Sequence, residues 1–352
     1  MDASTLTKIV RQRQIPLLVS LSRSLATPVY RAAFLATATR LGILKRLRAR
    51  PCDLASLARA AGIDGDTDLL RRWLDIGVRT GELSWFDDCY RLRGRTAKAL
   101  AGPRGDAVAA ALEEVLRFHI PVMLDAPAML KDGRRLQLGD QDGSVIARST
   151  RVIQPFVEEA VRRVLDRRNP IRLLEVGCGN GTYVRYAAEL NPRLSALAID
   201  LQPDVAAEAA ENMAVWGLAG RVETRQGDIR TLDLEPQFDL VTLHNNIYYF
   251  PVEERTAVLR HARSLLAPGG KLLLTTSCQG GGLSLEVLNL WFSYAEFGGP
   301  LPHADELLAQ LADAGFADVA AHTLIPGEQF RAFVGTNQPA RRSAAQVLTA
   351  KE

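Results

Sequence analysis

The stretch that most constrains the fold is Ile171-Arg-Leu-Leu-Glu-Val-Gly-Cys-Gly-Asn-Gly181, where a short apolar run passes directly into closely spaced glycines. The apolar run is typical of a buried parallel strand, and the amphipathic segment 183–190 that follows is typical of a helix. Because glycine has no side chain, the turn between strand and helix can bring its backbone close to a ligand. The stretch therefore predicts a cofactor-binding turn.

The spacing of the glycines limits which cofactor this turn can hold. A dinucleotide fingerprint needs Gly-x-Gly-x-x-Gly, but Thr182 stands where its third glycine belongs. There is also no Gly-Lys-Ser/Thr, which excludes a P-loop. The pattern Glu-x-Gly-x-Gly-x-Gly instead resembles motif I of the class I S-adenosylmethionine (SAM) methyltransferases. This resemblance implies that the loop packs on the methionyl part of SAM, while Glu175 and nearby carbonyl groups hold its ammonium.

Further strands follow in the order that this resemblance implies. Segment 195–200 is apolar and ends in an acid about 20 residues after the glycines, where a ribose diol is held. Segment 226–229 resembles the family's acid beside the adenine amine, and 238–244 and 266–274 are the next two strands. We expect an α/β, Rossmann-like class I methyltransferase domain. Its predicted cofactor-binding residues are Glu175, Gly177, Gly179, Gly181, Asp200, Leu201, Gly227, Asp228 and Ile229.

The length of 352 residues suits two domains, and charge is unevenly spread. Residues 1–150 hold 24 Lys and Arg against 16 Asp and Glu, whereas the rest hold 19 against 24. The predicted parts are a mostly helical winged-helix dimerisation domain (1–104), a helical linker roofing the acceptor pocket (105–170), a SAM-binding catalytic domain (171–336) and a flexible tail (337–352).

The cysteines and the apolar runs indicate a cytoplasmic protein. The four cysteines are scattered without any Cys-x-x-Cys, so they suggest neither a disulfide framework nor a zinc knuckle. The apolar run 15–21 is too short to span a membrane, and no targeting signal is recognised. We expect no membrane partner.

The basic N-terminal half has two interpretations. In the first, Arg71, Arg72 and Arg79 lie on the recognition helix of a DNA-binding winged helix. In the second, the domain serves dimerisation, as in the small-molecule O-methyltransferases whose two-domain layout this chain resembles. The recognition helix is largely apolar, and its acids, Asp66 among them, would repel phosphate. We favour a homodimer acting on a small molecule, without nucleic acid.

The acceptor chemistry centres on His244. In the O-methyltransferases resembled here the fourth strand runs into His-Asp-Trp, whose histidine is the general base, and this chain has His244-Asn-Asn246. His244 and Asn245 are therefore the predicted catalytic residues. The two acids that support the histidine in those enzymes are replaced, because Thr276 and Leu301 occupy their places.

A second histidine suggests a different reaction. His303 follows the missing acid and would face His244 across the acceptor pocket, where two imidazoles can bind a transition metal such as Fe or Zn. This resembles the 2-oxo-acid C-methyltransferases, whose metal stabilises an enolate. An alternative is that His303 only caps the helix that starts near Ala304. Arg148, on the last helix before the catalytic domain, and Tyr249 are the predicted substrate-binding residues. For Arg148 alone a solvated helix face is the favoured alternative, and for Tyr249 core packing is an equal one.

Three functions follow from these patterns. The favoured one is metal-assisted C-methylation at the β-carbon of a 2-oxo acid in secondary metabolism. The alternative is O-methylation of a phenol or enol hydroxyl with His244 as general base. The remote alternative is a winged-helix regulator that binds SAM without turnover.

Overall fold

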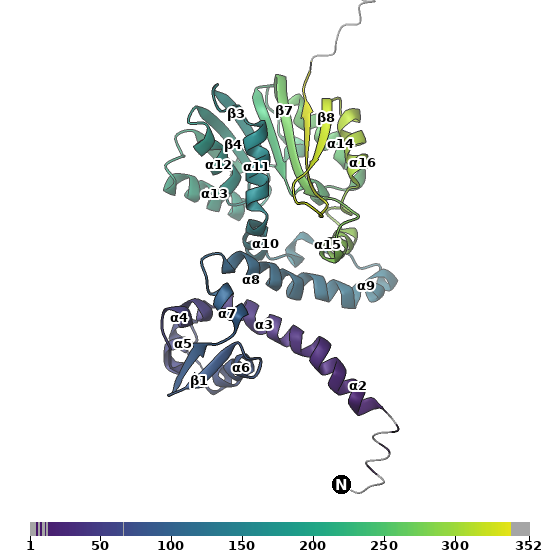
Figure 1. Ribbon diagram of the computed structural model, residues 1–352. Helices are drawn as coiled ribbons and strands as arrows, with labels where there is room; N and C mark the ends of the chain where they lie inside the picture. The colour runs from purple at the N-terminus through teal and green to yellow at the C-terminus, as the bar shows by residue number, and fades with distance from the viewer. Residues whose placement is uncertain (1–4, 6–7, 9–10, 12, 66, 339–352) are drawn as a thin grey trace, which may run out of the picture. The chain divides into compact units, whose positions relative to one another are not determined.

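The computed structural model describes residues 5, 8, 11, 13–65 and 67–338, and these form two compact units (Figure 1). The first unit contains the chain up to Pro121 together with Asp142–Val152, and the second contains Val122–Gln141 and the chain from Ile153 onward. The division therefore crosses the segment that the sequence predicts as one linker. Asp66 and residues 339–352, which hold most of the predicted tail, lie outside the described residues. Within the described part of the chain, no helix is both long and apolar enough to cross a membrane.

The first unit is helical apart from one hairpin. Asp53 caps the N-terminus of α5, since its side chain accepts a hydrogen bond from Ser56 N at 2.7 Å. The hairpin turns at Asp87 and Asp88, both with φ near +50°, as a two-residue type I′ turn requires. The elements of this unit are α2 (Gln14–Leu21), η1 (Ser22–Ala26), α3 (Thr27–Arg40), α4 (Ile43–Ala49), α5 (Leu54–Ala60), α6 (Thr67–Arg79), β1 (Leu83–Phe86), β2 (Cys89–Leu92), α7 (Arg95–Leu100), α8 (Gly105–Glu114), η2 (Val115–His119), α10 (Gly143–Ser149) and η4 (Thr150–Val152).

The second unit is built on a seven-stranded sheet of order β5-β4-β3-β6-β7-β9-β8. The first five of these strands are parallel, and β9 and β8 add an antiparallel edge. Four of the five strands predicted between 171 and 274 lie where the sequence places them. The third, placed at 226–229, lies earlier in the chain as β5, and Ile229 begins the short η5 instead, because the glycine and aspartate at 227–228 end the strand. The strands are β3 (Ile171–Val176), β4 (Leu194–Asp200), β5 (Val222–Gln226), β6 (Phe238–His244), β7 (Leu266–Ser277), β8 (Ala317–Thr323) and β9 (Phe330–Thr336).

Helices cover both faces of this sheet. In Figure 1, α11, α12 and α13 lie on one side and α14 and α16 on the other. The helical segments are α9 (Ile120–Asp132, which starts in the first unit), η3 (Leu138–Asp140), α11 (Gln154–Val164), α12 (Thr182–Leu190), α13 (Pro203–Val215), η5 (Ile229–Thr231), η6 (Ile247–Tyr249), α14 (Val252–Ser264), α15 (Leu283–Ser293) and α16 (Ala304–Asp313).

The order of the strands fixes where a ligand can bind. From β3 the chain moves outward through β4 to β5, and then returns to place β6 on the other side of β3. The strand order therefore reverses between β3 and β6. In open α/β sheets ligands bind at such a switch point, beyond the carboxyl ends of the strands. The glycine turn follows β3 and His244 ends β6, so both lie at this edge.

Candidate active site

The glycine turn after β3 has the backbone that its sequence predicts. Gly177, Gly179 and Gly181 have φ of 67°, 54° and 82°, the left-handed region that glycine enters without penalty. A Cβ on Gly177 would lie 2.8 Å from Asn246 Nδ2, and one on Gly181 would collide with Met213. A Cβ on Gly179 would meet nothing within 4 Å, so this backbone faces open space. The turn is packed at its two ends and accessible at its centre.

Glu175, the last acid of β3, is buried without a charged partner. Its Oε2 lies 3.5 Å from Thr242 Oγ1, opposite it on β6, and its Oε1 is unpartnered within the described part of the chain. Burial raises the pKa of this carboxyl to about 8, and the hydroxyl of Thr242 opposes the shift only weakly. An approaching ammonium group would provide both the donor and the charge that Glu175 lacks.

Asp200 ties the end of β4 to the glycine turn. Its Oδ2 accepts a hydrogen bond from Gly179 N at 3.0 Å and its Oδ1 one from Gln202 N at 3.1 Å. Gly227 N donates to the backbone carbonyl of Asp200 at 2.9 Å, which brings the end of β5 to the same place. Burial raises the pKa of Asp200, against the backbone hydrogen bonds. Each carboxylate oxygen keeps a lone pair that could accept from a diol. The neighbouring Leu201 is half exposed.

Asp228 caps the short η5, since its Oδ1 accepts from Arg230 N at 2.9 Å. The Arg230 guanidinium also pairs with this carboxylate, at 2.7 Å from Nη2 to Oδ2. Burial by itself would raise the pKa of Asp228, but the hydrogen bonds and charge of Arg230 lower it overall. Asp228 is therefore an ionised acceptor at neutral pH, and the next residue, Ile229, is buried.

His244 ends β6 as a buried, neutral ring. Its Nδ1 lies 2.9 Å from Thr275 Oγ1, and its Nε2 has no partner among the described residues. Tyr183, in the first turn after the glycines, packs edge-on against the ring with centroids 4.9 Å apart. Burial lowers the pKa of His244 to about 3. The contact with Tyr183 places His244 beside the glycine turn, as expected of a residue that contacts the acceptor.

The two asparagines after His244 play different parts. Asn245 takes φ of 55°, a conformation that asparagine tolerates, and its N–H donates to Thr275 O at 2.7 Å. The side-chain Nδ2 of Asn246 donates to Val176 O at 2.5 Å, which leaves Asn246 Oδ1 buried and unpartnered within the described chain. The catalytic role predicted for Asn245 stays a prediction. Asn246, in contrast, joins β6 to the end of β3.

The sequence did not single out Asn246 or Thr275 as site residues. Their contacts follow from the sheet order of the folded chain, because the end of β6 lies beside β3 on one side and beside β7 on the other. Thr276, which stands at the position of the family's glutamate, bonds to Ser277 O instead of the histidine. The residue that contacts the ring is its neighbour Thr275, opposite His244 in the β6–β7 register.

Tyr249 lies in an aromatic group just after β6. Its ring centroid is 5.0 Å from that of Phe292 and 5.6 Å from that of Phe297, and its hydroxyl donates to Gln141 Oε1 at 2.9 Å. Tyr248 also packs on Phe292, with centroids 4.5 Å apart. The substrate-binding role of Tyr249 stays a prediction, now with a defined aromatic setting.

Arg148 lies in the first unit and is engaged by carboxylates there. Its Nη2 lies 2.7 Å from Asp106 Oδ1, and its Nη1 is 3.6 Å from Glu113 Oε2. Arg151 lies 3.5 Å from the same Asp106. The predicted binding of a substrate carboxylate by Arg148 would have to compete with these ion pairs.

The predicted metal site is not supported. His303 is exposed at the N-cap position of α16, while His244 is buried on Thr275, and no interaction between the two rings is found among the described residues. The side chain of His303 makes no capping hydrogen bond. Within the described part of the chain, no three His, Cys, Asp or Glu side chains gather as metal ligands. His303 therefore occupies the N-cap position that the alternative expectation gave it, but its side chain does not cap the helix.

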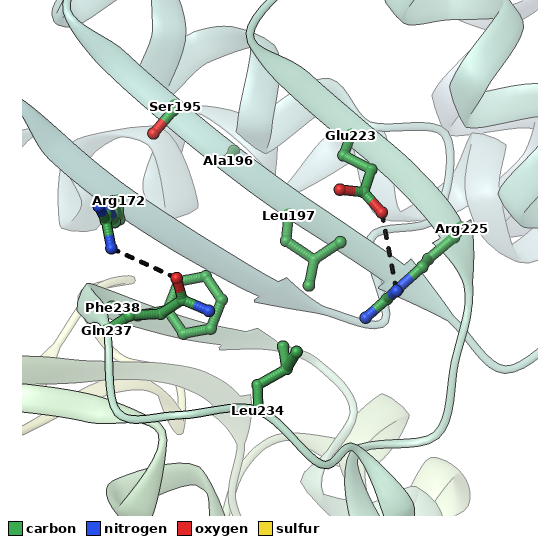
Figure 2. A pocket seen from close by; sticks show the side chains of 9 residues that line it. All are labelled: Arg172, Ser195, Ala196, Leu197, Glu223, Arg225, Leu234, Gln237 and Phe238. Atoms are coloured by element: carbon green, nitrogen blue, oxygen red, sulfur yellow. Dashed lines mark hydrogen bonds and ion pairs between the residues drawn. The ribbon is translucent and has the colours of Figure 1, made fainter.

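A separate cavity of about 260 Å³ lies near the amino-terminal ends of β3 to β6 (Figure 2). Figure 2 shows Arg172 with Gln237 and Glu223 with Arg225 on its walls. None of the predicted site residues lines this cavity. It is therefore distinct from the site at the carboxyl ends of the strands.

Comparison with known proteins agrees with this geometry. Residues 174–272 match the family described as "Methyltransferase domain". The chain is similar to demethylspheroidene O-methyltransferase of Rhodobacter capsulatus, with 25% identity over 241 residues, 62% of this chain and 59% of that protein. It is also similar to 3-hydroxy-5-methyl-1-naphthoate 3-O-methyltransferase of Streptomyces sahachiroi, with 24% identity over 73% of this chain and 76% of that protein. The match thus spans about three fifths of the length of the first relative.

A solved structure extends the likeness to nearly the whole fold. The structure of PigF with SAH has a TM-score of 0.71 and 17% identity, covering 91% of this chain and 99% of that one. The segment that matches the family starts in β3 and ends in β7, so it contains the glycine turn, Asp200, Asp228 and His244. The chain therefore carries a class I SAM-dependent methyltransferase domain behind a helical N-terminal region, in the two-domain fold of the O-methyltransferases that it resembles.

Proposed function

We propose that this chain is a SAM-dependent O-methyltransferase that acts on a phenol or enol hydroxyl of a small molecule. One observation carries the proposal. Three buried polar atoms without a hydrogen-bond partner in the described chain, Glu175 Oε1, His244 Nε2 and Asn246 Oδ1, lie at the carboxyl ends of β3 and β6. Buried polar atoms are nearly always satisfied, so atoms left unsatisfied at a switch point indicate a ligand site.

The residues at this edge fit SAM. Glu175 Oε1 and Asn246 Oδ1 are both acceptors, which suits the ammonium of the methionyl part. The open backbone at Gly179 leaves room for the chain of the cofactor, and Asp200 is placed at the end of β4 for the ribose hydroxyls. Asp228, next along the sheet edge, would accept from the adenine amine.

The chemistry divides between cofactor and chain. Bound SAM supplies a methyl group that is electrophilic because it is attached to a sulfonium. The residues of this chain have to align an acceptor oxygen with that methyl and exclude water. His244 is the buried polar side chain at the end of β6, at the same sheet edge as the glycine turn, and Tyr183 packs against its ring. We assign the contact with the acceptor oxygen to this residue.

The aromatic group after β6 supports a flat acceptor. Tyr249 and Phe297, both half-buried, pack around the buried Phe292 just after the strand that carries His244. Aromatic rings stack well on such surfaces. Both relatives described above are O-methyltransferases by name, whereas metal-assisted C-methylation of a 2-oxo acid has neither a relative among them nor a paired-histidine site to support it. O-methylation, the alternative from the sequence, therefore replaces it.

We further propose a cytoplasmic homodimer. All four cysteines are free, as expected in a reducing compartment. Apolar side chains are exposed along α2, η1 and α3 of the first unit, which suits burial against a second copy.

Calorimetric titration with SAM tests the cofactor half of this proposal. Asp200→Ala should weaken SAM binding at least about tenfold, because hydrogen bonds to a charged group are worth about 1.5–3 kcal/mol. Asp204→Ala removes an exposed acid four residues later and should leave the affinity unchanged. Equal SAM affinity in wild type and Asp200→Ala would contradict the placement.

The reaction half is tested by the product. Hydroxynaphthoates and naphthols incubated with methyl-labelled SAM should gain the label on oxygen, which carbon NMR distinguishes from a methyl on carbon. A product labelled on carbon would contradict O-methylation while leaving the SAM site intact.

A further inference from the structure

Arg230 occupies the acid that the proposed function assigns to the adenine amine. Its Nε lies 3.1 Å from Asp228 Oδ1 and 3.0 Å from Oδ2, and its Nη2 lies 2.7 Å from Oδ2. The backbone N–H of Arg230 also donates to Oδ1, at 2.9 Å. Each oxygen of Asp228 therefore faces two donors, which engages the roughly four lone-pair positions that a carboxylate offers.

Three of these four contacts can be given up without unfolding the turn. The backbone contact caps η5 and stays with it. The other three are made by a guanidinium whose side chain is 42% exposed. Because each carboxylate oxygen is already engaged twice, an adenine amine that reaches Asp228 has to displace at least one N–H of the guanidinium. The amine and Arg230 therefore compete for the same acceptor.

A second position for the guanidinium lies next to Asp228. The remaining nitrogen, Nη1, lies 3.4 Å from Glu254 Oε2 in the first turn of α14. The guanidinium carbon is 5.9 Å from the centroid of the Phe250 ring, within the range of a cation–π contact. When Arg230 turns away from Asp228, it therefore keeps a carboxylate and an aromatic ring as neighbours.

We propose that Arg230 competes with the adenine amine for Asp228: it holds the carboxylate in the SAM-free protein and turns to Glu254 and Phe250 when the cofactor binds. Arg230 acts through Asp228 and is a positioning residue that sets the affinity for the cofactor. This inference rests on the proposed SAM site, in which Asp228 accepts from the adenine amine. The site then binds its cofactor less tightly than its own acceptors allow.

Such competition favours exchange of the cofactor. SAM and its demethylated product, S-adenosylhomocysteine (SAH), carry the same adenine, so the pair of Arg230 with Asp228 opposes both to a similar extent. When SAH leaves, the guanidinium returns to Asp228, and the carboxylate is not left without a partner. The competition thus lowers the affinity for the product and for SAM by a similar factor.

Calorimetric titration of the full chain with SAH measures the competition. SAH is the better probe because it lacks the sulfonium charge of SAM. Arg230→Met removes the guanidinium and keeps a flexible stem, so SAH should bind roughly two- to fivefold more tightly than to wild type, as expected when a partly exposed ion pair is lost. Weaker binding would make Arg230 itself a ligand of the cofactor, and equal binding would mean that it does not compete. Either result overturns the inference, and damage to the site cannot imitate a gain in affinity.

Arg225→Met is the matched control for the change in net charge. Arg225 lies on β5, is similarly exposed, and among the described residues pairs with Glu223, at 3.7 Å, and not with Asp228. Its replacement should leave the affinity for SAH unchanged. A gain equal to that of Arg230→Met would assign the effect to net charge and would overturn the competition at Asp228.

Glu254→Gln tests where the guanidinium goes. A neutral amide offers Arg230 a weaker second position, so SAH should bind roughly twofold less tightly than to wild type. Glu253→Gln removes the neighbouring exposed acid of the same helix turn and should leave the affinity unchanged. An unchanged affinity in Glu254→Gln would overturn the assignment of Glu254 as the second position.

A double-mutant cycle shows whether Arg230 acts through Asp228. In an Asp228→Asn background the neutral amide pairs only weakly with a guanidinium, so adding Arg230→Met should no longer tighten SAH binding. The same gain in both backgrounds would overturn the inference. The single variants decide it even if Asp228→Asn binds SAH too weakly to titrate. Failure of the proposed function would look different, because wild type would then not bind SAH, or Asp228→Asn alone would bind it as tightly as wild type.

Discussion

At the scale of single residues, we expect Glu175 to couple the proposed SAM binding to pH. Its pKa of about 8 in the folded, SAM-free protein lies above its ordinary value of 4.5. Between these two values the folded state binds more protons than the unfolded state, so stability falls as the pH rises through this window. Glu175→Gln cannot ionise, and it should unfold less readily than wild type at pH 8 without SAM, by on the order of 3 kcal/mol.

The same substitution should have the opposite effect once SAM is present. Loss of the charged acceptor should weaken SAM binding roughly tenfold or more. Thermal unfolding at pH 6 and pH 8, with and without SAM, measures both effects in one experiment. If the SAM-free stability difference between wild type and Glu175→Gln is the same at both pH values, the buried carboxyl is not the group that titrates.

Gly177 makes a prediction about packing at the turn. In Gly177→Ala the new methyl group would press on Asn246 Nδ2, 2.8 Å away, and would displace the amide from Val176. We expect a drop in SAM affinity of at least about tenfold, in addition to roughly 1 kcal/mol of backbone strain at positive φ.

Gly217→Ala is the matched control for this change. Gly217 has φ of 70°, close to that of Gly177, but nothing lies within 4 Å of its Cβ position. Both variants should lose similar stability from strain, and only Gly177→Ala should lose SAM affinity in calorimetry. Equal affinities would mean that Asn246 is not a ligand of the cofactor.

These residues also show how far sequence alone can specify the site. The glycines, Glu175, Asp200 and His244 could be placed because they end or directly follow strands with a clear apolar pattern. Asp228 could be placed only through its resemblance to the family's acid. Asn246 and Thr275 could not be singled out, because their roles depend on which strands are neighbours and on the register between them. A register is a long-range property, and one residue of shift would have put Thr276 on the ring in place of Thr275.

At the scale of secondary-structure elements, the buried carboxylate of Glu113 forms ion pairs with arginines from three other helical segments of the first unit. Glu113 on α8 is 5% exposed, and its Oε1 lies 3.1 Å from Arg40 Nε of α3 and 3.2 Å from Arg117 Nη1 of η2. Its Oε2 faces Arg148 of α10. Glu113→Gln should lower the free energy of unfolding by about 2 kcal/mol, less than for a fully buried pair, because the arginines are partly exposed.

Asp106→Asn is the comparison for this network. Asp106 also pairs with Arg148, but its side chain is 41% exposed, so its loss should cost less than about 1 kcal/mol. Denaturant unfolding curves of the two variants give the ranking. A larger loss for Asp106→Asn would indicate that the Arg148–Asp106 pair, and not Glu113, organises these helices.

At this scale the sequence predicted the catalytic elements better than the connecting ones. The inner strands β3, β4 and β6 are near-continuous apolar runs, because both faces are covered, and such runs are easily recognised. Segment 105–170 has no comparable signature. It was predicted as one linker, yet it is shared between two compact units, because its contacts are made with residues distant in sequence.

At the scale of the whole molecule, the order of helices and strands can be predicted from the sequence, but the surface that would bind a second copy of the chain cannot. The two-domain fold rests on recurrent motifs that any chain of this type must contain. A dimer depends on which exposed surfaces match a second copy, and exposure is a property of the folded chain. The prediction of a homodimer can now be tied to named side chains of the first unit.

Leu18 and Leu25, on α2 and η1, are 63% and 61% exposed. Covering a leucine is worth about 1.5–3 kcal/mol, so replacing both by aspartate should raise the dissociation constant of a dimer roughly a hundredfold or more. Light scattering at micromolar concentration should then show a dimer for wild type and a monomer for Leu18→Asp/Leu25→Asp. Leu283→Asp changes a leucine of the second unit that is even more exposed, at 81%, and should remain dimeric. If the double variant keeps the mass of the wild type, the apolar side chains of α2 and η1 are not the dimer contact.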